Sequence, residues 1–176
     1  VALVGSGFMG SILLQLLTHS PASNISVFDL RPEALAYAGT LRGKAPLDVY
    51  DLKESPDSAS LAGSFDVVFE TAAVEPAFRM ANALVRAGGT LAIFSWHHHD
   101  ISFDFGDWHV RGIKVLNTSP AAAPDFTACF KRSVPLLERR IVDLEPLTTH
   151  VGLPEDAKRI YEHGLAKTDG YIKGVI

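Results

Sequence analysis

Short apolar runs alternate along the chain with stretches of helical spacing, and this alternation predicts a sheet covered by helices. The run at 65–71 is almost unbroken, which is typical of a parallel strand covered on both faces. Six strands alternating with helices predict an α/β fold, a doubly wound parallel six-stranded sheet of the Rossmann type with strand order 3-2-1-4-5-6. The strands are expected at 1–4, 24–28, 47–50, 65–71, 90–94 and 112–117.

The limits of the helices follow from glycine, proline and the spacing of apolar residues. A helix follows the first strand through Leu17, one at 31–38 should end at Gly39, and one at 75–87 should end at the pair 88–89. A polar loop is expected at 53–58. The helix at 125–140 should be kinked or broken at Pro135. Its apolar side is formed by Phe126, Cys129, Phe130, Val134 and Leu137. We expect the side chain of Cys129 to be buried.

The last part of the chain does not continue the alternation. A strand at 146–151, a helix at 154–163 and a strand at 171–176 follow a sheet that is already complete. These elements are too small to fold alone. We therefore expect a dinucleotide-binding domain at 1–142 and a C-terminal segment at 143–176.

The first strand runs directly into the spacing G-x-G-x-x-G, formed by Gly5, Gly7 and Gly10. Between a strand and a helix, this spacing indicates a nucleotide-phosphate site. The first glycine lets the chain turn, the second leaves room for a pyrophosphate, and the third lets the helix approach the strand. The helix then offers free backbone N–H groups to the phosphates. Phe8 and Met9, within the same loop, are expected to contact the coenzyme as well.

The second strand ends in Asp29, nineteen positions after Gly10. An acid at this distance is expected to hold the hydroxyl groups of a ribose. Its charge would repel a 2′-phosphate, so NAD is favoured over NADP as the cofactor. Leu30 and Arg31 come next in the chain and are included in the expected cofactor site.

The carboxyl ends of parallel strands meet at one edge of a sheet, where ligands bind. This edge is expected to bring together four places that lie far apart in the sequence, namely 5–10, Asp29, 71–73 and 94–96.

Composition narrows the class of partner. The chain has 176 residues, 47% of them hydrophobic, and a net charge of −4 without a basic patch, which argues against DNA, RNA or an anionic membrane as partner. No apolar run is long enough to span a membrane, and no signal peptide precedes the fold. Cys129 is the only cysteine, which excludes an internal disulfide and favours a cytoplasmic setting. The chain opens inside a strand without a methionine, so a preceding segment is expected.

A histidine cluster at 97–99, with acidic residues nearby, raises the possibility of a metal site. Adjacent histidines of an extended chain point in alternating directions, so at most two would share one ion. We therefore predict no metal ligand and no catalytic residue in this chain. The favoured interpretation is a loop near the nicotinamide, in which His97 is a candidate for contact with substrate or nicotinamide.

The order of motifs resembles the coenzyme-binding half of the medium-chain dehydrogenase/reductase family, of the zinc alcohol and polyol dehydrogenase type. The resemblance runs nearly from end to end. It rests on the segments at 4–10, 28–29, 66–70, 87–91, 149–157 and 170–173.

The resemblance implies an NAD-dependent oxidoreductase that acts on an alcohol or polyol and carries its catalytic zinc in a domain upstream of Val1. Thr71 and Ala72 would face the adenosine, 94–96 (Phe94, Ser95, Trp96) would face the nicotinamide, and Lys173 would approach the phosphates. The tail would return to the catalytic domain, and a homodimer would form through the sixth strand. Two positions depart from the family pattern, because Ala73 and Ser95 stand where glycine is frequent.

Two other classes of function remain open from the residues alone. A regulatory domain that senses NAD(H) would carry the same βαβ fingerprint without chemistry. A methyltransferase dependent on S-adenosylmethionine also combines a glycine-rich loop with an acid at a strand end, although the compact loop and the strand order fit it less well. In the leading interpretation, the coenzyme supplies the hydride chemistry and this chain alone turns nothing over.

Overall fold

The computed structural model describes residues 1–54 and 58–176 and contains the predicted six-stranded sheet. All its strands are parallel, and their order is β3-β2-β1-β4-β5-β6. This result confirms the fold class and the strand order. The strands are β1 (Ala2–Val4), β2 (Ile25–Asp29), β3 (Leu47–Asp51), β4 (Phe65–Glu70), β5 (Val85–Ile93) and β6 (Lys114–Asn117).

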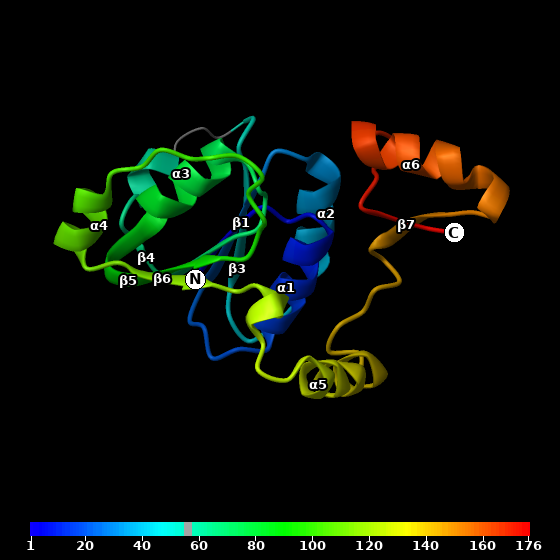
Figure 1. Ribbon diagram of the computed structural model, residues 1–176, viewed down its shortest axis with the longest axis horizontal. Helices are drawn as coiled ribbons and strands as arrows, with labels where there is room; N and C mark the ends of the chain where they lie inside the picture. Colours follow the sequence, from blue (N-terminus) through cyan, green and yellow to red (C-terminus); the bar gives the residue numbers. More distant parts are fainter. Residues whose placement is uncertain (55–57) are drawn as a thin grey trace.

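Helices cover both faces of the sheet (Figure 1). On β1, Ala2 and Val4 pack in one core with residues of α3 (Glu75–Leu84), whereas Leu3 packs in a second core with α1 (Phe8–Thr18) and α2 (Pro32–Thr40). This alternation follows the two-residue period of a strand. Because the central strands are buried on both sides, the polar ligand-binding groups gather at the ends of the strands.

Two helix limits differ from the expectation. The helix expected at 75–87 ends at Leu84, and β5 begins at Val85 because Val85 already pairs with Phe65. The left-handed turn expected after the helix occurs at Gly88, with φ of 70°, inside β5, where the register with β4 shifts. Similarly, α2 does not end at Gly39 but continues to Thr40.

Two further expectations are corrected beyond the fifth strand. The loop after β5 contains an unexpected helix, α4 (Phe105–Arg111), capped by the side chain of Asp104. The helix α5 (Phe126–Glu138) runs through Pro135, so the break that was one of the two expected outcomes does not occur, and none of its residues is buried. Cys129 is accordingly only half-buried, because the apolar side of α5 faces away from the packed layers.

The C-terminal segment forms a small separate unit at one end of the molecule, beyond α2 (Figure 1). Strands β7 (Thr148–Val151) and β8 (Lys173–Val175) pair in parallel and are bridged by the 3₁₀ turn η3 (Pro154–Asp156) and α6 (Ala157–Ala166). Both strands are shorter than the expected 146–151 and 171–176, and α6 begins three residues later than the helix expected at 154–163, because η3 occupies its first turn. The buried apolar residues of the C-terminal segment are few, namely Leu147, Ile160 and Ile172.

Two short 3₁₀ turns, η1 (Ser58–Leu61) and η2 (Pro120–Ala122), complete the elements. Of the polar loop expected at 53–58, residues 55–57 lie outside the described residues. Within the described ranges, no helix has the length and apolar character that crossing a membrane requires.

Candidate functional site

In the loop between β1 and α1, Gly5 and Gly10 occupy positions where a side chain would be strained or would collide with neighbouring atoms. Gly5 has φ of 92°, a conformation that side chains disfavour, and its N–H donates to the carbonyl oxygen of Phe28 at 2.8 Å. A side-chain carbon on Gly10 would collide with the carbonyl oxygen of Gly5 and lie 2.9 Å from Thr71 Oγ1. The first and third glycines therefore hold α1 close against the strands.

The middle glycine leaves the amino terminus of α1 open. Gly7 is the N-cap, no side chain caps the helix, and the first helical bond runs from the N–H of Ser11 to the carbonyl of Gly7. The N–H groups of the first turn therefore have no partner within the helix. They form a cradle with a partial positive charge, to which an anion such as a phosphate can bind.

Asp29, at the end of β2, is held by backbone and hydroxyl donors. Its Oδ2 accepts from the N–H and the hydroxyl of Ser6, at 2.6 and 3.1 Å, and its Oδ1 accepts from the N–H groups of Leu30 and Arg31, at 2.7 and 2.9 Å. The carboxylate is only 8% exposed. It thus fixes the glycine loop against β2, and a ribose hydroxyl would share these oxygens with Ser6. The sequence pointed to Asp29 but gave no reason to single out Ser6.

Arg31 brings a cation over the same loop. Its Nε lies 3.5 Å from Asp29 Oδ1, and a side-chain carbon on Gly7 would lie 3.2 Å from its Nη2. Lys173, from β8, brings a second cation to the loop, with its Nζ 5.2 Å from the centroid of the Phe8 ring. Both cations therefore lie where the sequence predicts the phosphates of a dinucleotide.

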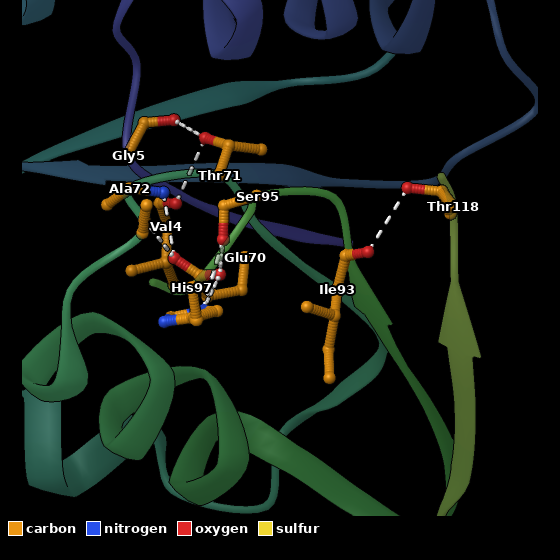
Figure 2. Close-up of polar contacts among 10 residues, drawn as sticks. Val4, Gly5, Glu70, Thr71, Ala72, Ile93, Ser95, His97 and Thr118 are labelled. Atoms are coloured by element: carbon orange, nitrogen blue, oxygen red, sulfur yellow. Dashed lines mark hydrogen bonds and ion pairs between the residues drawn. The ribbon is translucent and has the colours of Figure 1, made fainter. Parts of the chain in front are cut away.

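Thr71 joins the glycine loop to the end of β4. Its hydroxyl donates to the carbonyl oxygens of Gly5 and Val4, at 2.5 and 3.2 Å (Figure 2). Its N–H also donates to the carbonyl oxygen of Val4, at 2.9 Å. The next polar link runs from the same strand to β5. Glu70 accepts from the backbone N–H groups of Ala72 and Ala73, at 2.8 and 2.9 Å, and from the Ser95 hydroxyl.

His97 completes this link, because its Nε2 lies 2.8 Å from Glu70 Oε2 and 3.1 Å from Ser95 Oγ (Figure 2). Glu70 has no exposed surface, and the His97 side chain is 16% exposed. The four places expected to converge are thus joined by hydrogen bonds. Sequence reasoning missed Glu70 as a site residue, although a carboxylate that ends a buried strand is a signal that could have identified it.

The two positions that depart from the family pattern have distinct consequences. Ala73 has φ of 60°, the left-handed conformation that glycine adopts without cost. Ser95 supplies the hydroxyl that binds Glu70, which a glycine would lack. The end of β5 is therefore hydrogen-bonded differently from a site with glycine at this position.

A pocket of about 780 Å³ opens beyond the end of β5. Its floor includes Ile93 and 94–97, and its walls include Phe78, Phe103 and Trp108. The carbonyl of Ile93 accepts from the hydroxyl of Thr118 at 3.1 Å, which ties the loop after β6 to the pocket (Figure 2). The pocket is wide enough and sufficiently aromatic for a planar ring.

Three predicted site residues point toward solvent. Met9 and Leu30 are 49% and 52% exposed, and Trp96 is 78% exposed and stacks on His98 at 5.2 Å. Trp96 nevertheless borders the pocket. Across residues 1–54 and 58–176, no group of three or more His, Cys, Asp or Glu side chains forms a metal-binding cluster.

Comparison with known proteins assigns the family. The model of the family described as zinc-binding dehydrogenase matches residues 9–138. The chain is 23% identical to an L-threonine 3-dehydrogenase of Alteromonas mediterranea over 92% of this chain and 47% of that protein. It is also 23% identical to the L-threonine 3-dehydrogenase of Pectobacterium atrosepticum, over 85% of this chain and 41% of that protein. The chain therefore spans less than half the length of these relatives.

Solved structures share the fold at low identity. An alcohol dehydrogenase from Thermus sp. ATN1 superposes with a TM-score of 0.82 at 20% identity, over 98% of this chain and 49% of that chain. L-idonate 5-dehydrogenase from Escherichia coli gives 0.80 at 18% identity, over 98% and 48%. A zinc-binding dehydrogenase from Sinorhizobium meliloti, solved with NADP, gives 0.75 at 19% identity, over 90% and 47%. The chain belongs to the zinc-binding dehydrogenase family.

Proposed function

We propose that this chain is the coenzyme-binding portion of an NAD-dependent dehydrogenase that oxidises an alcohol or polyol, or reduces the corresponding carbonyl. The observation that carries the proposal is the closed glycine loop, whose open helix terminus lies beside Asp29 and two cations. The family assignment supports it, as do relatives named for the dehydrogenation of threonine, idonate and an alcohol.

The residues present fit a dinucleotide at the carboxyl edge of the sheet. The N–H groups at the start of α1 would bind the pyrophosphate, helped by Arg31 and Lys173. Asp29 would accept from a ribose hydroxyl, and Thr71 and Ala72 would border the adenosine. The pocket beside 94–96 would hold the nicotinamide. The bound coenzyme supplies the hydride chemistry, and the chain supplies its position.

The preference for NAD rests on the carboxylate of Asp29, which lies at the end of β2 and would repel a 2′-phosphate. The neighbour from Sinorhizobium meliloti was solved with NADP, so both coenzymes must be compared directly. A cytoplasmic setting belongs to the proposal as well, because Cys129 is a free thiol.

The organisation of the whole protein is also a proposal. Residues 1–142 would form the dinucleotide-binding domain, and 143–176 would return to a catalytic domain that carries the zinc and the substrate. The chain covers 47% and 41% of the two threonine dehydrogenases, which supports a missing half. The outer edge of β6 would pair with a second copy to form a homodimer.

Thermal unfolding with separate ligands tests the proposal. A ligand that binds the folded chain raises its melting temperature. We expect NADH to raise it, NADPH to raise it less and S-adenosylmethionine to leave it unchanged. A rise with S-adenosylmethionine alone would indicate a methyltransferase instead.

A turnover assay tests the proposal that the catalytic half is absent. We expect no alcohol oxidation by this chain alone. Alcohol oxidation by the chain after removal of metal would contradict this expectation.

A further inference from the structure

The buried carboxylate of Glu70 makes contacts that coenzyme binding at the glycine loop does not require. Glu70 is 0% exposed, and each of its oxygens faces hydrogen-bond donors. Oε1 accepts from two backbone N–H groups, and Oε2 accepts from the hydroxyl of Ser95 and lies 2.8 Å from His97 Nε2. A buried carboxylate oxygen needs hydrogen-bond donors, so Nε2 of the His97 ring carries a hydrogen that points toward Glu70.

The hydrogen on Nε2 determines whether the other ring nitrogen, Nδ1, is a hydrogen-bond donor or acceptor. In a neutral imidazole whose Nε2 carries the hydrogen, Nδ1 is an acceptor. Nδ1 lies on the side of the ring away from Glu70 (Figure 2). The ring is held in place by Phe78, whose ring meets it edge to face at 5.9 Å. His97 thus lines the pocket in a fixed orientation.

Apolar and aromatic side chains, including Phe78, Ile101 and Phe103, make up most of the pocket lining, to which Asp100, Asn117 and Thr118 add polar groups. The indole N–H of Trp108 already donates to Asn82 Oδ1 at 2.6 Å, so it adds no polar group to this wall. A ligand group that donates a hydrogen bond in such surroundings needs an acceptor, because an unpaired buried donor is costly. The carboxamide of a nicotinamide ring is a planar group with two N–H donors.

We propose that Glu70 and His97 form a dyad in which His97 Nδ1 accepts a hydrogen bond from the carboxamide NH₂ of the coenzyme. The inference rests on the proposed function, since it requires a nicotinamide in the pocket. His97 is the contact residue. Glu70 is a positioning residue, because it acts only by fixing the hydrogen on Nε2 and the orientation of the ring.

A coenzyme analogue without the donor tests this assignment. In reduced 3-acetylpyridine adenine dinucleotide, a methyl group replaces the carboxamide NH₂. Calorimetric titration of the chain should give a Kd for NADH about tenfold lower than for this analogue, the factor that corresponds to one hydrogen bond. In His97→Phe, which keeps a flat ring, the ratio of the Kd for the analogue to the Kd for NADH should fall to about one. NADH should bind this variant more weakly than the wild type, whereas the affinity for the analogue should not change.

A second variant separates the positioning role from the contact. In Glu70→Gln, the side-chain amide can donate to His97 Nε2, which moves the hydrogen to Nδ1 and removes the acceptor. The ratio of the Kd for the analogue to the Kd for NADH should again fall toward about one, although His97 is still present in this variant. His98→Phe is the matched control, because His98 is exposed beside Trp96 and does not line the pocket, and its ratio should stay at the wild-type value.

The outcomes distinguish this inference from the proposed function. ADP-ribose lacks the nicotinamide and should bind the wild type and every folded variant equally. If neither ADP-ribose nor NADH binds the wild type, the proposed function fails. If both bind, a wild-type ratio near one overturns the dyad, as does an unchanged ratio in His97→Phe or Glu70→Gln. A wild-type ratio near one overturns the dyad even if both variants fail to fold.

Discussion

Gln15 and Asp143, 128 positions apart in the sequence, are joined by two hydrogen bonds between the side-chain amide of Gln15 and the backbone of Asp143. Nε2 donates to the carbonyl oxygen at 3.0 Å, and the N–H of Asp143 donates to Oε1 at 2.5 Å. Gln15 lies on α1, the helix that begins at the glycine loop. The C-terminal segment is therefore anchored to this helix, and β8 then brings Lys173 to Phe8.

The position of Lys173 predicts a contribution to coenzyme binding. In Lys173→Ala, we expect the Kd for NADH to rise roughly two- to fivefold, since a partly exposed cation near a phosphate contributes about 0.5–1 kcal/mol. The loss should shrink at high salt, because salt screens the attraction. Lys158→Ala is the control, because Lys158 is 88% exposed on α6 and its Nζ lies 3.9 Å from Glu162 Oε1. Equal effects of both substitutions would remove Lys173 from the site.

The closeness of Gly10 to Gly5 predicts a loss of stability on substitution. In Gly10→Ala, the new methyl group would collide with the carbonyl of Gly5, and we expect a loss of about 1–3 kcal/mol in the free energy of unfolding. Gly39→Ala is the control, because nothing lies within 4 Å of the added carbon and the residue is helical. That variant should gain about 0.5–1 kcal/mol. Denaturant unfolding measures both, and a neutral Gly10→Ala would contradict the close packing of the loop.

The glycine loop and the strand order could be predicted because they depend on local spacing and on short apolar runs. The start of β5 could not, because the pairing of Val85 with Phe65 is a tertiary contact that overrides the helical spacing before it. α4 was missed because none of its residues is buried, so no apolar period marks it. Its capping residue Asp104 and the left-handed Gly112 were the available signals.

At the candidate site, the sequence identified the residues that we expect to contact a coenzyme, but not the residues that hold them in place. Asp29 follows from its distance to the glycines. Its bond to Ser6 depends on the fold of the loop. The link between Glu70 and His97 joins residues 27 positions apart across two strand ends, and no local pattern encodes it.

The charge of Asp29 predicts coenzyme preference. In Asp29→Asn, the side chain keeps its shape but no longer repels a 2′-phosphate, while Arg31 remains beside it. The ratio of the Kd for NADPH to that for NADH should therefore fall by about tenfold, as for the loss of roughly 1.4 kcal/mol of discrimination. Asp48→Asn, an exposed position on β3 bound to Asn24, should leave the ratio unchanged. Calorimetric titration with both coenzymes measures it, and a constant ratio in Asp29→Asn would assign the preference elsewhere.

The ion pair of α4 predicts a dependence of stability on pH. Hydrogen bonds from Arg111, at 2.5 and 2.8 Å, lower the pKa of Asp107 below its usual value. A lowered folded-state pKa stabilises the protein above the unfolded pKa of about 3.9, and this contribution is lost as the pH falls through the folded value. In Asp107→Asn and in Arg111→Gln, this part of the acid-induced fall in melting temperature should be missing. Curves that coincide with the wild type would contradict a role for this pair.

The most direct test of the central claim uses the middle glycine of the loop. In Gly7→Asp, the carboxylate can cap α1 and pair with Arg31, so the fold should be retained. The same carboxylate would stand where the pyrophosphate must approach. Calorimetric titration with NADH should give one site per chain in the wild type and no measurable binding in Gly7→Asp. Equal binding by both, or no binding by the folded wild type, would contradict the assignment of the glycine loop as the coenzyme site.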